Sequence, residues 1–272
     1  MTELQELRRY RRDLHRIPEL DFDLPQTIAY IEGVLASLAC EVTHPCPSCV
    51  CAFFDAGTGA AHATAIRADM DALPIAEATG AAFSSKHPGK MHACGHDGHM
   101  AMALAAATFV DRTIREQPGA IKRNVLFVFQ PAEETFYGAQ SIVDKGHLDD
   151  VMNFIAVHIA LSAENKPLPS HTVACGCRDF LSDRQLDVYL EGKAAHPCGA
   201  SQEGKNALLA ACSATLNIHS IAPHEEGLCR VNVGEIHAGV CANTIAPNAM
   251  MRIEYRGQKP AISEYAGQRI FD

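Results

Sequence analysis

The sequence lacks several features that would assign a protein to a class at once. No apolar run is long enough to span a membrane, and residues 1–16 contain no apolar core of the kind that a secretory signal requires. No Lys/Arg-rich run is present either, and the formal net charge is -9 at pH 7. Internal repeats and low-complexity tracts are also absent. We therefore expect a cytoplasmic protein whose partner is a small molecule, not a nucleic acid or a membrane.

The composition that remains is that of an ordinary globular protein. Its 272 residues, 47% of them hydrophobic and 20% charged, are enough for one large domain or two modest ones, and we expect two. The 11 cysteines could suggest a disulfide scaffold, but a chain of this length and core content does not need one. We expect reduced thiols.

Three cysteines, Cys46, Cys49 and Cys51, have a spacing that resembles a set of metal ligands. Their C-x-x-C-x-C pattern could hold zinc, but no second C-x-x-C and no matching histidine pair follows nearby. We favour separate thiols on a strand over a structural zinc site.

The first two thirds of the chain predict helices that alternate with buried strands. Apolar residues at helical spacing indicate helices over 3–16, 26–39 and 98–110. Apolar runs of strand length cover 50–54, 63–68, 125–129 and 154–157. Strands buried on both faces and separated by helices predict an α/β layered domain with a largely parallel or mixed central sheet.

Acidic and imidazole side chains follow three of these predicted strands. Asp69 and Asp71 follow the second strand, Glu133 and Glu134 the third, and His158 the fourth. In such sheets the ligand lies beyond the carboxyl ends of the strands. We therefore expect these side chains to meet at one edge of the sheet.

The pattern changes near residue 182, where polar and apolar residues alternate as in a half-exposed strand. Further along, the pattern predicts a helix, two strands and the start of another helix, over 206–220, 229–236, 248–256 and 262–271. The inward face of the first of these helices is expected to consist of Leu208, Leu209, Cys212 and Leu216. We predict one domain over 1–181 and a small, incomplete α/β sandwich over 182–272.

Residues 91–99 contain one thiol, three imidazoles and a carboxylate, a density of metal-binding groups that core packing does not produce. Cys94 and His96 are two positions apart, so in an extended loop both side chains can reach one ion. Thiolate and imidazole suit zinc or a similar transition metal. We expect His99 to support a ligand, and a divalent ion needs about four donors, so others must come from elsewhere in the chain.

Glu133 and Glu134 are adjacent carboxylates after an apolar strand. Burying both is unfavourable unless a cation or a shared proton compensates their repulsion. One can bind a metal while the other takes a proton from water and passes it to a leaving amine. The alternative is an exposed acidic turn.

Several motifs occur in an order that resembles a known family. They are DLHR at 13–16, PEL at 18–20, IRADMDALP at 66–74, HACGHDGH at 92–99, QPAEE at 130–134 and GKAAH at 192–196. Together they resemble the M20 metallopeptidase family, in its amidohydrolase branch. That branch includes hippurate hydrolases, N-acyl-amino-acid amidohydrolases and auxin-conjugate hydrolases.

The resemblance implies a catalytic domain over 1–181 with two divalent metal ions per subunit, zinc or manganese, with cobalt or nickel as alternatives. Its metal ligands would be Cys94, His96, Glu134 and His158. Glu133 would be the general base. Arg67 stands where relatives carry a histidine ligand, so it is not a metal donor here. Asp69 is expected to orient a metal ligand without binding the metal itself. For Asp71 we favour a turn-capping role.

The resemblance also implies that residues 182–272 form a lid and dimerisation domain, so that we expect a homodimer. His196 would stabilise the oxyanion across the dimer, and Asn243 and Arg256 would hold the substrate. The alternatives are an exposed turn histidine for His196 and an arginine on the surface of a strand for Arg256.

Members of the family continue beyond the point where this sequence stops, with a last histidine ligand and the rest of the lid. We therefore expect a chain truncated at its C-terminus, with an unpaired sheet edge and one metal position short of a donor. Hydrolysis of N-acyl amino acids is the leading hypothesis. A catalytically silent fragment that binds metal or other chains, and a dipeptidase or aminopeptidase of the same family, are the alternatives.

Overall fold

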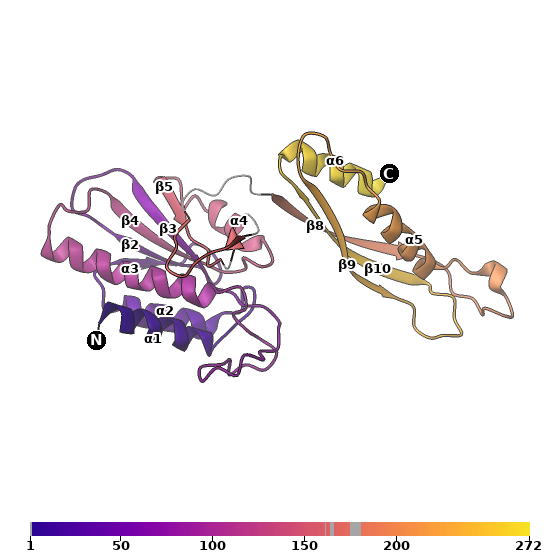
Figure 1. Cartoon of the computed structure of the whole chain (residues 1–272), viewed down its shortest axis with the longest axis horizontal. Helices are drawn as coiled ribbons and strands as arrows, with labels where there is room; N and C mark the ends of the chain where they lie inside the picture. Colours follow the sequence, from indigo (N-terminus) through magenta and orange to yellow (C-terminus); the bar gives the residue numbers. More distant parts are fainter. Residues whose placement is uncertain (1, 161, 164–165, 175–180) are drawn as a thin grey trace. The chain divides into compact units, whose positions relative to one another are not determined.

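The computed structural model describes residues 2–160, 162–163, 166–174 and 181–272. The chain divides into two compact units, Met1–Ser170 and His171–Asp272 (Figure 1). The boundary predicted between residues 181 and 182 lies directly before β8, Ser182–Glu191.

The first unit is built on a five-stranded mixed sheet with strand order β1-β2-β4-β3-β5. β3 pairs in parallel with both β4 and β5, whereas β2 pairs antiparallel with β4 and with β1. The strands are β1 Glu41–Thr43, β2 Val50–Phe54, β3 Ala63–Asp69, β4 Asn124–Gln130 and β5 Val151–Ala156. The predicted α/β class with a mixed central sheet is confirmed.

Helices α1 (Glu3–His15), α2 (Pro25–Leu35) and α3 (His96–Glu116) cover one face of this sheet (Figure 1). A capping box of Thr2 and Gln5 starts α1, and a proline in the first turn starts α2. The core on this face combines apolar residues of the three helices with inward residues of the strands, among them Leu14, Ile31, Leu104 and Phe127. Each such fully buried side chain stabilises the fold by about 1.5–3 kcal/mol.

The opposite face of the sheet carries a second, smaller core. Side chains alternate along a strand, so Phe127 of β4 points to the helical side while Leu126 and Val128 point to the other. There they pack with Ile142 of α4, Tyr137–Val143, and with a group of cysteines. Strand β4 is therefore buried on both faces, as its unbroken apolar run predicts.

Two predictions for the first unit are corrected. The helix expected over 98–110 begins at His96 and continues to Glu116, beyond the apolar run, and the buried Asp111 accepts hydrogen bonds from Arg115 in the added turn. The last strand, expected to be buried on both faces, is instead half-exposed: Phe154 and Ile155 are 52% and 48% accessible. The reason is that β5 is the edge strand and pairs only with β3 in the described part of the chain.

The second unit is a three-stranded antiparallel sheet with helices. The sheet has the order β8-β10-β9, with β9 at Cys229–Ala238 and β10 at Asn248–Gly257. Helices α5 (Ala207–His219) and α6 (Pro260–Phe271) contribute to its core together with the three strands.

The predicted inward face of α5 is wrong. Leu209 and Leu216 are 63% and 76% exposed, Leu208 is 38% exposed, and Cys212 is exposed too. The buried residues of α5 are Ala207, Ala211 and Ile218, which pack with Met251 and Ile253 of β10. This helix is apolar nearly all round, so its sequence does not single out one face.

Neither unit contains a helix that is both long and apolar enough to cross a membrane, in the residues that the structure describes.

Candidate metal centre

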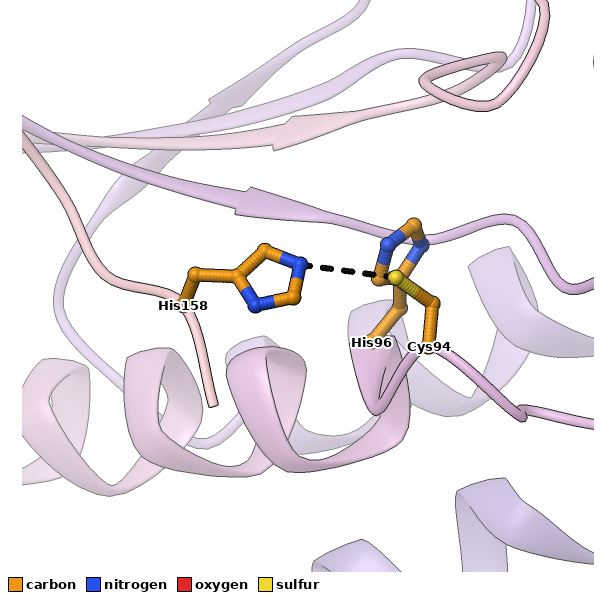
Figure 2. A group of neighbouring side chains, drawn as sticks. All are labelled: Cys94, His96 and His158. Atoms are coloured by element: carbon orange, nitrogen blue, oxygen red, sulfur yellow. Dashed lines mark hydrogen bonds between the residues drawn. The ribbon is translucent and has the colours of Figure 1, made fainter. Parts of the chain in front are cut away.

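Polar side chains of the first unit gather at one edge of its sheet. The parallel strands β3 and β4 end in register at Asp69 and Gln130, and β5 leads into His158 at the same edge. The loop before α3 brings Cys94 and His96 there, next to His158 (Figure 2). The side chains that the strand-end argument predicts to meet do lie together.

The donor atoms of this cluster are close enough to share metal ions. Cys94 Sγ lies 3.4 Å from His158 Nε2, and Cys94, His96 and His158 form a group whose donor atoms are all within 4.8 Å of one another (Figure 2). His96, Glu133 and Glu134 form a second group of this kind. His96 belongs to both groups, so it lies where two neighbouring ions could be bound.

A glycine allows the tight loop that presents Cys94 and His96. Gly95 has a φ of 93° and is the residue directly before α3. Residues with side chains rarely adopt this conformation, and a Cβ at Gly95 would lie 3.4 Å from the side chain of Ile159. The loop can therefore turn into the helix within one residue while Ile159 packs closely against it.

The backbone around the two glutamates is held by Asp71. Its Oδ1 accepts a hydrogen bond from the N–H of Glu133 at 2.9 Å, and its Oδ2 accepts one from Glu134 at 3.0 Å. The carbonyl oxygen of Asp71 accepts a hydrogen bond from Nδ1 of His96 at 2.7 Å. This bond leaves Nε2 of His96 facing the carboxylates, 3.8 Å from Glu133 Oε2 and from Glu134 Oε1. Asp71 thus caps a turn, as favoured from the sequence, and also orients His96.

Asp69 and His99 form a buried pair beside this cluster. Nδ1 of His99 donates to Asp69 Oδ1 at 2.6 Å, while Nε2 of His99 accepts the backbone N–H of Ile159 at 2.9 Å. Both ring nitrogens of His99 are therefore engaged with the protein. Burial raises the pKa of Asp69, but the hydrogen bond from His99 and the nearby His96 and Arg67 outweigh it and lower the pKa to about 2. Asp69 is accordingly a charged anchor for the imidazoles around it.

The residues present fit a bound cation. Nε2 of His96 and Oε1 of Glu134 are buried without a hydrogen-bond partner among the described residues, although each such atom costs about 1–3 kcal/mol when unpaired. A cation between them would satisfy both. Burial, together with Glu134 and the other nearby carboxylates, raises the pKa of the Cys94 thiol to about 12, so only a strong positive charge would convert it to a thiolate. Thiolate, imidazole and carboxylate together are typical of zinc and related ions.

A hydrogen-bond network that the sequence analysis did not identify joins α1 to the first turn of α3. Asp97 is buried, and its Oδ2 accepts hydrogen bonds from Nε of Arg11 at 3.0 Å and from Nδ1 of His15 at 2.8 Å. The hydrogen bond with Asp97, supported by Glu77, raises the pKa of His15 although burial opposes the shift. Arg11 and His15 are four residues apart on one helical face, and that spacing is the signal that could have revealed the pair.

The remaining predicted site residues lie in the second unit. His196 is exposed, and its Nδ1 accepts the backbone N–H groups of Cys198 and Gly199 at 3.2 Å each, which directs Nε2 outward. Asn243 is exposed as well. The guanidinium of Arg256 pairs with Asp183 and Glu254 on its own sheet. Their catalytic and substrate-binding roles stay predictions.

The sequence matches a known protein family and several curated relatives. Residues 65–264 match the model of Peptidase family M20/M25/M40. The chain is 38% identical to one subunit of the p-aminobenzoyl-glutamate hydrolase of Escherichia coli (strain K12), over 90% of this chain and 53% of the relative. It is 41% identical to indole-3-acetyl-aspartic acid hydrolase of Enterobacter agglomerans, over 75% of this chain and 47% of the relative. The chain thus spans about half the length of these relatives.

Solved structures share the fold. An aminobenzoyl-glutamate utilization protein from Klebsiella pneumoniae aligns over 98% of this chain and 70% of its own, with a TM-score of 0.77 and 28% identity. A dinuclear metal-binding M20 peptidase from Bacillus subtilis aligns over 98% of this chain and 68% of its own, with a TM-score of 0.72 and 26% identity. The latter likeness agrees with a donor set that could hold two ions.

Proposed function

Because the chain belongs to Peptidase family M20/M25/M40, we propose that it hydrolyses the amide bond of small N-acyl amino acid conjugates in a metal-dependent reaction. The observation that carries the proposal is that His96 Nε2 and Glu134 Oε1, two buried atoms of the donor cluster, have no hydrogen-bond partner in the described part of the chain. The names of the relatives support the reaction class, since they describe hydrolases and deacetylases of acylated amino acids.

Two divalent ions would be held by Cys94, His96, Glu134 and His158, with zinc or manganese as the proposed metals and cobalt or nickel as alternatives. When bound, the ions would supply positive charge that polarises the scissile carbonyl and makes a water molecule more acidic. The protein itself holds the side chains in position. Asp71 contributes three hydrogen bonds to this: its carboxylate binds the backbone N–H groups of Glu133 and Glu134, and its carbonyl oxygen binds the ring of His96.

Glu133 is the proposed general base. Its side chain is 30% exposed and reaches within 3.8 Å of His96 Nε2, so it borders both the donor cluster and solvent. Glu134 lies deeper on the same turn, and burial raises its pKa, which favours its use as a ligand that a cation would keep charged. Glu133 would take a proton from the attacking water and pass it to the departing amine.

Residues of the second unit would complete the reaction in a homodimer. The outward Nε2 of His196 is free to donate to a developing oxyanion, which is the group that such a donor stabilises most. Asn243, also exposed, would contact the substrate's carbonyl, and Arg256 would bind its carboxylate. For Arg256 this requires that the substrate compete with Asp183 and Glu254.

The first experiment tests Glu133 with the isosteric substitution Glu133→Gln. Hydrolysis of N-acetyl and N-benzoyl amino acids should fall roughly 10²–10⁴-fold, because proton transfer by a positioned side chain contributes about that much. The metal content, measured by inductively coupled plasma mass spectrometry, should stay the same. Glu116→Gln, at the exposed end of α3, is the matched control. Normal turnover by Glu133→Gln would exclude Glu133 as the base.

Two rival functions are separated by simple assays. A catalytically silent fragment that binds metal or other chains would contain one ion or none and hydrolyse no substrate. The proposed enzyme would contain two ions and hydrolyse N-acyl amino acids. A dipeptidase or aminopeptidase would instead prefer free dipeptides over N-acylated amino acids in a substrate panel.

A further inference from the structure

His158 lies beyond the end of β5, where the sheet no longer holds the chain. The pairing of β5 with β3 ends at Ala156, and residues 157–160 belong to no strand or helix. All residues from 152 to 160 are exposed as well. Nevertheless, Nε2 of His158 lies 3.4 Å from the Sγ of Cys94 (Figure 2). Contacts outside the sheet must therefore keep this side chain at the donor cluster.

The next residue, Ile159, makes two hydrogen bonds that fix His158. Its carbonyl oxygen accepts a hydrogen bond from Nδ1 of His158 at 2.7 Å. In a neutral ring this places the proton on Nδ1, so Nε2 faces Cys94 with the lone pair that a metal ligand needs. The backbone N–H of Ile159 donates to Nε2 of His99 at 2.9 Å. The backbone of Ile159 thus sets both the orientation of the His158 ring and the path of the chain beside it.

His99 is a buried acceptor whose own position is fixed. Its Nδ1 donates to Oδ1 of Asp69 at 2.6 Å, so its Nε2 is the nitrogen that accepts from Ile159. The rings of His99 and His158 also pack edge to face, with their centroids 4.7 Å apart. Because His99 lies in α3, which begins at His96, these contacts join the end of β5 to the helix that carries another proposed ligand.

The side chain of Ile159 packs on two glycines of the same region. A Cβ at Gly98 would lie 2.4 Å from Cδ1 of Ile159, and a Cβ at Gly95 would lie 3.4 Å from this atom. Gly98 belongs to the first turn of α3, where alanine is more favourable than glycine and no left-handed conformation requires a glycine. A packing reason is expected for a glycine in such a place. The contact with Ile159 supplies that reason.

We propose that Ile159 is a positioning residue of the candidate metal centre, which holds His158 against the start of α3 through its N–H, its carbonyl oxygen and its side chain. Gly98 gives Ile159 the room that this contact needs. The inference rests on the metal centre of the proposed function, but it concerns how the protein holds one donor and not the reaction itself. Moving Ile159 moves His158 away from Cys94, so metal affinity falls while the unit stays folded.

The first test is Gly98→Ala in the full chain, because the added methyl group would displace the side chain of Ile159. Co²⁺ alone is titrated into the metal-free, reduced protein and followed by its visible absorption. We expect the affinity to fall by about 10–100-fold, the loss typical of residues that orient a ligand. The midpoint of urea unfolding without metal should not fall, since alanine favours a helix more than glycine does. A purely structural defect would lower that midpoint.

Gly33→Ala is the matched control, because Gly33 is a helical glycine of α2 whose added Cβ would meet open space. It should leave the Co²⁺ affinity unchanged. Equal affinities in Gly98→Ala and Gly33→Ala would overturn the proposal.

Ile159→Ala supplies a rescue test and should fold, since the side chain that it shortens is 45% exposed. By itself it should weaken Co²⁺ binding, because His158 loses the packing of its neighbour. With Ile159→Ala in place, the methyl group of Gly98→Ala has no side chain to displace. The affinity of the double variant should therefore match that of Ile159→Ala within about twofold. Losses that simply add would show that the two residues do not act through one contact.

Hydrogen exchange of the metal-free protein, measured by NMR, tests the contact without an ion. The amide of Ile159 should exchange slowly in the unchanged chain, because it is bonded to His99, and faster in Gly98→Ala. Rapid exchange of this amide in the unchanged chain would overturn the proposal. The proposed function fails in a different way, as a metal-loaded chain that hydrolyses no N-acyl amino acid.

Discussion

The two units of the molecule arrange their predicted functional residues in opposite ways. In Met1–Ser170 the side chains predicted from distant segments converge, and His96 Nε2 lies within 3.8 Å of both glutamates. In His171–Asp272 His196 and Asn243 are exposed, and Arg256 is in an ion pair on the sheet. The first unit therefore has a site that can be judged from its own geometry. In the second unit, the role of the predicted side chains depends on a substrate or a partner chain that would contact them.

The largest effect on the donor cluster of the first unit is expected from removing His96, because this side chain belongs both to the group with Cys94 and His158 and to the group with Glu133 and Glu134. His96→Ala should weaken metal binding by more than about 100-fold, beyond the loss typical of residues that only support a ligand. Metal content after dialysis and residual amide hydrolysis measure the effect. His62→Ala, at an exposed histidine before β3, is the control and should retain metal. If His96→Ala keeps two ions per chain, His96 is not a ligand.

A smaller effect is expected at Asp71, which touches the donors without being one of them. Asp71→Asn replaces one of the two oxygens that accept backbone N–H groups by an amide NH₂ group, which cannot accept. Metal affinity should fall by about 10–100-fold, as for other residues that orient ligands. Competition with a chelator measures it. Asp55→Asn changes a comparable acceptor in an exposed turn and should have no effect. Equal affinities in the two variants would show that the Asp71 contacts do not position the centre.

The last comparison concerns the stability of the second unit and sets the two faces of α5 against each other. Ile218→Ala should destabilise that unit by about 2–5 kcal/mol, since Ile218 is 6% exposed and packs in its core. Leu216→Ala, at a residue 76% exposed, should change stability by less than about 0.5 kcal/mol. Urea unfolding followed by circular dichroism compares the two. A large loss for Leu216→Ala that depends on protein concentration would instead show that another chain covers this face, which would support the proposed dimer.

The candidate site of the first unit could be predicted largely from sequence because its signals are local. Cys94 and His96 occupy a short loop with a glycine between them, and the acids directly follow apolar strands. Parallel strands carry such residues to one edge whatever their separation along the chain. The helical spacing of Arg11 and His15 is also a local signal, but it does not identify their partner Asp97. Asp97 is far away in the sequence, and only the packing of α1 on α3 brings it to them.

The burial of several apolar residues could not be predicted, because the sequence does not specify which other segment will pack against them. Leu209 and Leu216 are as hydrophobic as the residues that α5 buries, yet the small side chains of Ala207 and Ala211 allow the closer approach to β9 and β10. The apolar run that contains Phe154 and Ile155 predicts a buried strand, but the order of the strands leaves β5 at the edge of the sheet.

The sequence by itself determined most of the longer helices and strands, the mixed α/β class and the family, because periodicity and ordered motifs are properties of neighbouring residues. Only the tertiary structure decided that Asp71 holds both glutamates and His96, that Cys46, Cys49 and Cys51 pack in one core, and which face of α5 is inward. These contacts join residues whose meeting depends on packing, and packing is set by shape and burial that no short segment encodes alone.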